Sequence, residues 1–130
     1  MNKPKVKSRY KKYFDELAET ARAELSKINS TPVFMVPIPG YDEDINGGVS
    51  WQMDETFITL PPIINSHFRL YIVAHEIGHI VYRHMLGPCS PENEAAADEW
   101  ALGKFNEWGL KVTPKIKAAM RQARFMERRI

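Results

Sequence analysis

The sequence contains very little cysteine and no long run of apolar residues, and both shortages limit what the protein can be. Its single cysteine, Cys89, excludes a disulfide bond within the chain and is typical of a reducing compartment. No stretch approaches the roughly 18 apolar residues of a membrane-spanning helix, and the basic N-terminal segment lacks the apolar centre of a signal peptide. We therefore expect a cytoplasmic protein with no membrane partner.

The sequence also lacks internal repeats and low-complexity segments, so nothing divides its 130 residues into separate units. With 44% hydrophobic residues, a chain of this length can bury one modest core. We expect a single domain over residues 9–130, preceded by a flexible basic arm over residues 1–8.

Charge is spread unevenly along the chain, although the formal net charge is only +2. Residues 1–12 hold six Lys/Arg and no acid, residues 13–103 hold four against fourteen Asp/Glu, and residues 104–130 hold eight against two. Two interpretations stay open: ordinary solvated helix faces that keep the protein soluble, or contacts of the basic termini with nucleic acid or an acidic protein.

Residues 75–79 read HEIGH and match the pattern H-E-x-x-H. On a helix, residues four apart share a face, so the imidazoles of His75 and His79 can bind one zinc ion at roughly 2.0–2.1 Å each. Glu76 points about 100° away and can instead reach a water molecule at the metal, as the general base of a zinc hydrolase does. The alternative is a core helix with two histidines at its wet border.

The surrounding residues predict a helix over residues 66–86 with one apolar side and one ligand-bearing side. Its apolar stripe contains Leu70, Val73, Ile77, Ile80 and Val81. Gly78 lies on the ligand-bearing side and costs about 1 kcal/mol in a helix interior relative to alanine. We therefore expect another backbone, of a substrate or an edge strand, to approach closely at Gly78.

The third metal ligand is expected on a second helix, in the alanine-rich run at residues 92–101. Glu94 and Asp98 are four apart and share a helix face with Ala97 and Ala101, whose small side chains let two helices pack closely. Glu94 as the ligand, with Asp98 hydrogen-bonded to a ligand histidine, is the simplest assignment. The alternative is that these acids belong to a solvated helix face.

These two motifs resemble those of the ImmA/IrrE-type zinc metallopeptidases, in which H-E-x-G-H is followed by a helix with the pattern E-x-x-A-x-x-F-A. In this chain Glu94, Ala97 and Ala101 match the second pattern, and Trp100 stands where phenylalanine is usual. The resemblance covers roughly residues 45–105.

The resemblance implies a gluzincin-like peptidase in which His75, His79 and Glu94 bind one zinc ion per chain and Glu76 is the catalytic base. Family members include proteins that cut DNA-bound repressors, so the implied partner is a specific intracellular protein, such as a transcriptional regulator. The chain shows no obvious helix-turn-helix or sensor segment, so its substrate, trigger and oligomeric state stay open.

The rest of the chain predicts a small α+β domain of zincin-like type. In order, we expect an N-terminal helix at 8–28, a strand at 33–36, a loop at 40–48, strands at 49–53 and 56–60, the two motif helices, and a basic C-terminal helix at about 113–130. The short strands are expected to be antiparallel, and the last helix to dock on the domain rather than to dimerise or to bind nucleic acid.

Other groups near the motif are given weaker roles. Tyr71 and Tyr82 lie on the ligand-bearing side and are candidates for stabilising the oxyanion. We interpret His84 as a surface histidine and Cys89 as a buried or inert thiol rather than a metal ligand. The rival interpretation of the whole chain is a non-catalytic zinc-containing protein, either an inhibitor or adaptor or a nucleic-acid-binding module that uses its basic termini.

Overall fold

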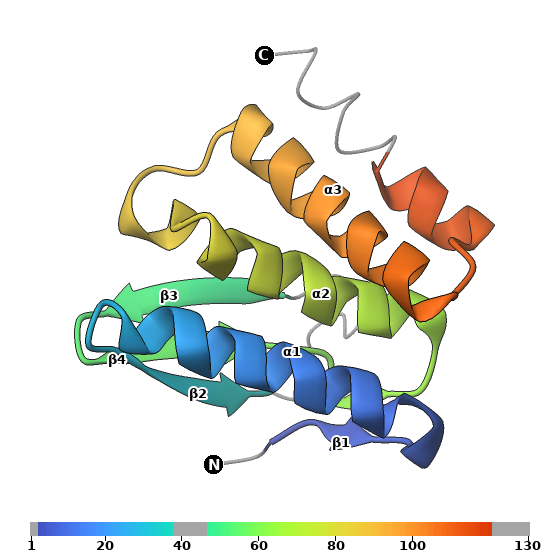
Figure 1. Ribbon diagram of the computed structural model, residues 1–130, viewed down its shortest axis with the longest axis horizontal. Coiled ribbons are helices and arrows are strands. Elements are labelled where there is room, and N and C mark those ends of the chain that lie inside the picture. Colours follow the sequence, from blue (N-terminus) through green and yellow to red (C-terminus); the bar gives the residue numbers. More distant parts are fainter. Residues whose placement is uncertain (1–2, 38–46, 121–130) are drawn as a thin grey trace.

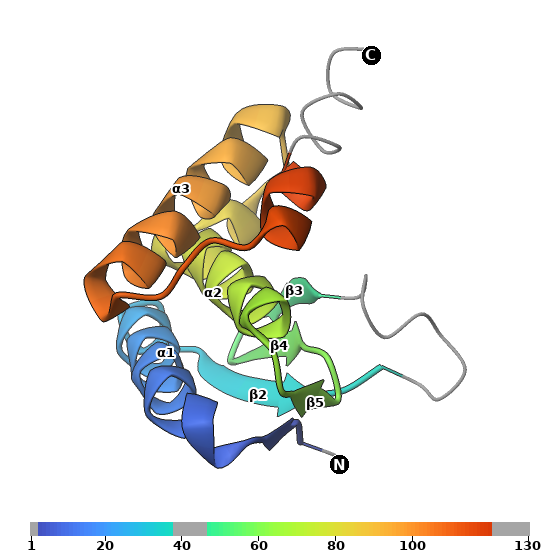
Figure 2. The same ribbon diagram turned by 90° about the vertical axis from the view of Figure 1, so that its right-hand side faces the viewer.

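The computed structural model describes residues 3–37 and 47–120, which form a layered α+β arrangement around one central helix. Helix α2 (His67–Val81) has the strands on one side and α3 (Pro91–Trp108) on the other (Figure 1, Figure 2). Helix α1 (Ser8–Ser26) packs beside α2 and against the sheet. The predicted α+β class is confirmed, and α2 is placed so that it contacts every layer.

The apolar stripes predicted on the helices form the core. Helix α2 begins where Ser66 accepts a hydrogen bond from the backbone N–H of Arg69 at 3.2 Å, which is a serine N-cap. The fully buried side chains of α1 and α2 include Leu17, Ala21, Leu25, Leu70, Ala74, Ile77 and Ile80. With this side of α2 fixed in the core, its other side is turned toward α3 and the sheet edge.

Helix α2 ends at Val81 rather than at Leu86 as predicted from the sequence. Arg83 has a left-handed backbone with φ of 62°, and a short 3-10 helix, η1 (His84–Leu86), follows it. The Arg83 guanidinium donates to the Ile80 carbonyl at 2.9 Å and lies 3.2 Å from a carboxylate oxygen of Glu24 in α1. The helix therefore ends at a turn held by a long-range contact, which no local sequence pattern reveals.

The strands run in mixed directions, so the expectation of purely antiparallel strands is corrected. Strand β2 (Thr31–Met35) pairs in parallel with β4 (Glu55–Thr59), and β4 pairs antiparallel with β3 (Gly48–Gln52). The β3–β4 hairpin was predicted, but β2 joins the far side of β4. Periodicity shows where strands lie and not which strands are neighbours, so the sequence did not predict the order β2-β4-β3, in which β3 lies at an edge among the described residues.

Part of the expected basic arm is held against the domain. Strand β1 (Lys5–Val6) pairs in parallel with β5 (Ile63–Ile64), and the N–H groups of Lys5 and Lys7 donate to the carbonyls of Pro62 and Ile64 at 2.8 and 3.0 Å. Residues 1–2 of the arm, and all but the last two residues of the loop predicted at 40–48, lie outside the described residues.

The C-terminal helix docks on the domain as far as the structure describes it. It begins at Pro114 and continues through Met120, and Ile116 is fully buried. The Lys115 ammonium lies 4.5 Å from the centre of the Phe68 ring of α2. The remainder of this predicted helix, residues 121–130, lies outside the described residues. Within the described ranges, no helix has the length and apolarity needed to cross a membrane.

Candidate metal centre

Helices α2 and α3 bring together three side chains that could hold a metal ion, namely His75, His79 and Glu94. The Nε2 atoms of the two histidines are 3.1 Å apart. Glu94 Oε2 lies 2.9 Å from His75 Nε2, and its Oε1 lies 3.3 Å from His79 Nε2. Two imidazoles and one carboxylate suit a transition-metal ion rather than the all-oxygen sites of calcium or magnesium. These are the three residues that the sequence predicted as ligands.

The carboxylate of α3 reaches the histidines of α2 because the two helices pack closely at Gly78. A Cβ atom added to Gly78 would lie 3.1 Å from the Ala97 carbonyl oxygen and 3.2 Å from its Cα. Ala97 is fully buried at this contact, and Cβ of Trp100 would lie 3.4 Å from the added atom. The close approach predicted at Gly78 is therefore present, but the approaching backbone is that of α3 and not that of a substrate or a strand.

The start of α3 fixes the position of Glu94 in the first helical turn. Ser90 accepts a hydrogen bond from the Asn93 backbone N–H at 3.2 Å, and Pro91 occupies the first helical position. The Glu94 side chain is 39% exposed, whereas those of His75 and His79 are only 16% and 9% exposed. The site therefore opens to solvent on the side of Glu94.

Asp98 is hydrogen-bonded to His75 at Nδ1, the ring nitrogen that does not face Glu94, as the sequence predicted. Its Oδ1 atom accepts hydrogen bonds from His75 Nδ1 at 2.8 Å and from the hydroxyl of Tyr71. Tyr71 is buried at this contact and does not line the cavity that opens between β3 and the segment after α2. Tyr82 is 50% exposed, and its ring stacks on that of His84. The structure thus places neither candidate oxyanion stabiliser in the cavity.

Glu76 lies beside the three ligands without joining them. Its Oε1 atom is 3.9 Å from His75 Nε2, and its side chain is only 8% exposed. Burial raises the pKa of Glu76 to about 7, although the nearby charges of His75 and His79 oppose this effect. A carboxyl group with such a pKa can exchange a proton near neutral pH. A bound cation would add positive charge and lower this pKa.

Proton and metal compete for the same ligand atoms. Burial lowers the pKa of His75, but its hydrogen bonds to Asp98 and Glu94 outweigh burial and raise the pKa to about 10. Hydrogen bonds from His75 and His79 hold the pKa of Glu94 well below its usual range. A metal ion that binds at neutral pH must therefore displace a proton from His75.

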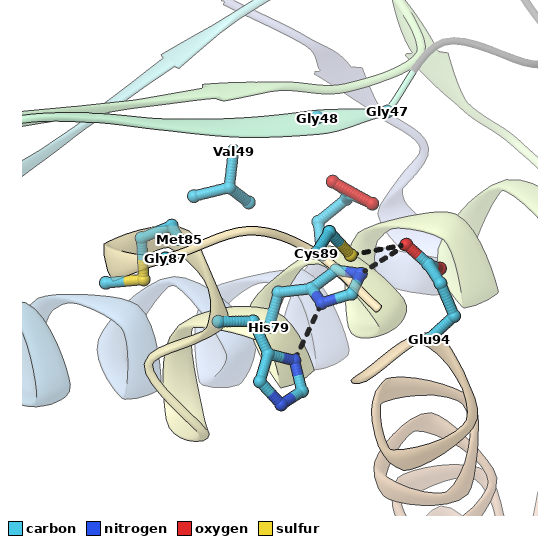
Figure 3. Close-up of a pocket in the computed structure, with 10 residues that line it drawn as sticks. Gly47, Gly48, Val49, His79, Met85, Gly87, Cys89 and Glu94 are labelled. Carbon is cyan, nitrogen blue, oxygen red and sulfur yellow. Dashed lines mark hydrogen bonds and ion pairs between the residues drawn. The ribbon is translucent and has the colours of Figure 1, made fainter. Parts of the chain in front are cut away.

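A cavity of about 250 Å³ opens beside the ligands, between β3 and the segment that follows α2 (Figure 3). Its lining residues are Gly47, Gly48, Val49, Glu76, His79, His84, Met85, Gly87, Cys89 and Glu94. His79 and Glu94, the buried carboxylate of Glu76 and strand β3 thus share one cavity, whereas His75 is not among its lining residues. Val49 and Met85 add apolar side chains to an otherwise polar wall.

Two of these lining residues, His84 and Cys89, were not recognised as parts of the site from the sequence. His84 Nδ1 lies 2.9 Å from His79 Nδ1, and burial, followed by the charge of His79, lowers the pKa of His84. Cys89 is exposed rather than buried, and its thiol donates to Glu94 Oε1 at 3.2 Å. Both residues follow the turn at Arg83, so the expected longer helix hid their positions.

Comparisons of the chain with protein-family models, with curated proteins and with solved structures found no match. The site is therefore interpreted from its own geometry and from its two sequence motifs.

Proposed function

We propose that this protein is a zinc-dependent metallopeptidase that hydrolyses a peptide bond in a specific intracellular protein. The observation that carries the proposal is the clustering of three side chains that could hold a metal ion beside the buried carboxylate of Glu76, with His79, Glu94 and Glu76 lining one cavity. Three protein ligands leave a coordination position open, as in catalytic zinc sites, whereas structural zinc sites are closed by four. The resemblance of both motifs to ImmA/IrrE-type metallopeptidases supports the same activity.

The distances among the ligand atoms support zinc. Bonds of roughly 2.0–2.2 Å in a tetrahedron place neighbouring ligand atoms about 3.3–3.6 Å apart. The two Nε2 atoms are 3.1 Å apart, and the two Glu94 oxygens lie 2.9 Å from His75 Nε2 (Oε2) and 3.3 Å from His79 Nε2 (Oε1), so small shifts of the side chains would suffice. A zinc ion held by His75, His79 and Glu94 would supply a Lewis acid that activates water and polarises a carbonyl group.

We assign proton transfer to Glu76. Its carboxylate is close enough to the ligands to take a proton from a water molecule whose oxygen attacks the scissile carbonyl carbon. The same carboxyl group then donates that proton to the amine that leaves as the C–N bond breaks. One water molecule is consumed, and a carboxylate and a protonated amine are the products, because the second proton of the water also passes to the amine.

The edge strand β3 supplies a place for an extended substrate. Among the described residues, β3 pairs only with β4, and Gly48 and Val49 of β3 line the cavity. A peptide added along the free edge of β3 would make main-chain hydrogen bonds and pass beside the ligands. By the family resemblance, we propose that the peptide belongs to a regulator protein such as a DNA-bound repressor.

Hydrolysis of a peptide library, followed by mass spectrometry, tests this proposal. We expect the zinc-loaded wild type to cleave some peptides, a chelator to stop cleavage, and Glu76→Gln to reduce the rate by about 10²-fold or more while zinc stays bound. Glu92→Gln is the matched control, since Glu92 is an exposed residue of α3 outside the cavity.

Cleavage by Glu76→Gln at the wild-type rate would contradict the proposed role of Glu76. A zinc-loaded wild type that cleaves nothing but binds DNA or RNA with a steep dependence on salt would favour the rival function, a non-catalytic nucleic-acid-binding module.

A further inference from the structure

We propose that His84 is a positioning residue for the metal centre, and that it holds the ring of His79 as Asp98 holds the ring of His75. The inference rests on the proposed metal-binding role of the three ligands. In both histidines, Nε2 faces the point where the three candidate ligand side chains converge. Nδ1 of each ring makes a hydrogen bond to another side chain. That partner is Asp98 Oδ1 at 2.8 Å for His75 and His84 Nδ1 at 2.9 Å for His79.

The direction of the hydrogen bond between the two imidazoles follows from the requirements of a ligand. A neutral imidazole that binds a metal through Nε2 carries its hydrogen on Nδ1. His79 must therefore donate from Nδ1, and His84 must accept at its own Nδ1 and carry its hydrogen on Nε2. His84 thus selects the tautomer of His79 in which Nε2 is free to bind the metal.

The fold places His84 against His79 by ending α2 between them. On an uninterrupted helix a residue five positions after His79 would lie about 140° around the axis, at roughly 100° per residue. The left-handed backbone of Arg83 instead turns the chain back toward the end of α2. The contacts of Arg83 with Ile80 and Glu24 stabilise that turn. His79 lies in the last turn of α2, so the turn at Arg83 brings His84 back to its ring.

The ring of His84 is itself held in a fixed orientation. Tyr82 stacks on it with ring centres 5.6 Å apart and an angle of 24° between the planes. The rings of His79 and His84 meet at 68°, with centres 5.1 Å apart. The acceptor nitrogen of His84 is thereby directed at His79 from one side while the stacked tyrosine covers its face.

Two substitutions of nearly equal shape test the proposal. In His84→Asn the amide oxygen can occupy the place of Nδ1 and accept the hydrogen bond, whereas His84→Leu has no acceptor. Zinc affinity is measured by competition with a chromophoric chelator, and the visible spectrum of the cobalt-loaded protein reports ligand geometry. His67→Asn serves as the control, because His67 lies at the other end of α2 and contacts Tyr10 instead.

We expect His84→Leu to weaken zinc binding by about 10- to 100-fold and to change the cobalt spectrum. His84→Asn should restore binding to within a few-fold of the wild type, and His67→Asn should leave it unchanged. Equal binding by His84→Leu and wild type, or equal loss in His84→Leu and His84→Asn, would overturn the role of His84 while leaving the metal centre intact.

A wild type that binds neither zinc nor cobalt would instead overturn the metal-binding proposal, and the role of His84 with it. Thermal melting of the metal-free variants shows whether they are folded. If His84→Leu does not fold, His84→Ala removes the same acceptor and takes its place in the comparison.

Discussion

At the scale of single residues, the position of the Glu76 carboxylate depends on the absence of a side chain at Gly47. A Cβ atom at Gly47 would lie 3.0 Å from Glu76 Cγ and 3.0 Å from Ile72 Cγ2. Contacts this short require Glu76 or the start of β3 to move. Gly48, the next residue, has nothing within 4 Å of an added Cβ atom.

Gly47→Ala should therefore lower peptide hydrolysis without loss of the metal. We expect kcat/KM to fall on the order of 10- to 100-fold, because a displacement of a catalytic group by a fraction of an ångström to 1 Å has such effects. Zinc content and Gly103→Ala are the controls, and both should match the wild type, since Gly103 is an exposed position of α3 outside the cavity with nothing within 4 Å of an added Cβ atom. Equal activities of the two alanine variants would show that Gly47 does not set the position of Glu76.

The residues whose placement could be predicted are those whose relation is fixed within one helix. The spacing of His75, Glu76 and His79 determines their directions on α2, and the spacing of Glu94 and Asp98 does the same on α3. His84 could not be assigned in this way, because its contact with His79 depends on a turn that breaks the helical period. The sequence shows only a third histidine close after the motif. Without that turn, the direction of its side chain could not be predicted.

At the scale of elements, the site depends on how closely α2 and α3 pack at Gly78. The helix interior disfavours glycine by about 1 kcal/mol relative to alanine. At Gly78 this preference is opposed by the Ala97 backbone, which would lie 3.1–3.2 Å from an added Cβ atom. A backbone cannot yield as a flexible side chain can, so the two helices would have to separate.

We expect Gly78→Ala to destabilise the protein by about 1–3 kcal/mol, as overpacking does, and to weaken metal binding by moving Glu94 away. Gly103→Ala is the matched control, because Gly103 is an exposed position inside α3 with nothing within 4 Å of an added Cβ atom. It should raise the free energy of unfolding by roughly 0.5–1 kcal/mol. Chemical denaturation measures both, and a stabilising Gly78→Ala would contradict the close helix contact.

The sequence predicted where the helices and strands lie more reliably than it predicted which strands pair with each other. Periodicity and capping residues gave α1, α2 and α3 and the β3–β4 hairpin. The parallel pairing of β2 with β4 and of β1 with β5 depends on contacts between distant segments. For this reason the edge position of β3, which places it beside the ligands, was not evident before the structure.

At the scale of the whole molecule, metal binding would join α2 to α3 and would be coupled to pH. His75 has a pKa raised to about 10 in the protein without a bound cation, so it is protonated at pH 8 and must lose that proton to bind a metal. Protons therefore compete with the metal, and the apparent affinity weakens as the pH falls.

Calorimetry of zinc binding at pH 8, in buffers with different ionisation enthalpies, measures this coupling. We expect at least one proton to be released per zinc ion bound, because His75 loses one and a water molecule on zinc can lose another at this pH. The Asp98→Asn variant should release fewer protons per zinc ion bound, because Asp98 is one of the partners that raise the pKa of His75. Zinc binding by the wild type without proton release would contradict the ionic pairing of His75 with Asp98 and Glu94.

The most direct test of the central claim is the metal content of the purified 130-residue chain, measured for the wild type, Glu94→Ala and Glu76→Gln after reconstitution with zinc. The claim predicts about one zinc ion per chain in the wild type, little in Glu94→Ala, and about one in Glu76→Gln. Such a result would show that Glu94 is a ligand and that Glu76 is not. A wild type that holds no zinc, or a Glu94→Ala variant that holds as much as the wild type, would contradict the proposed metal centre.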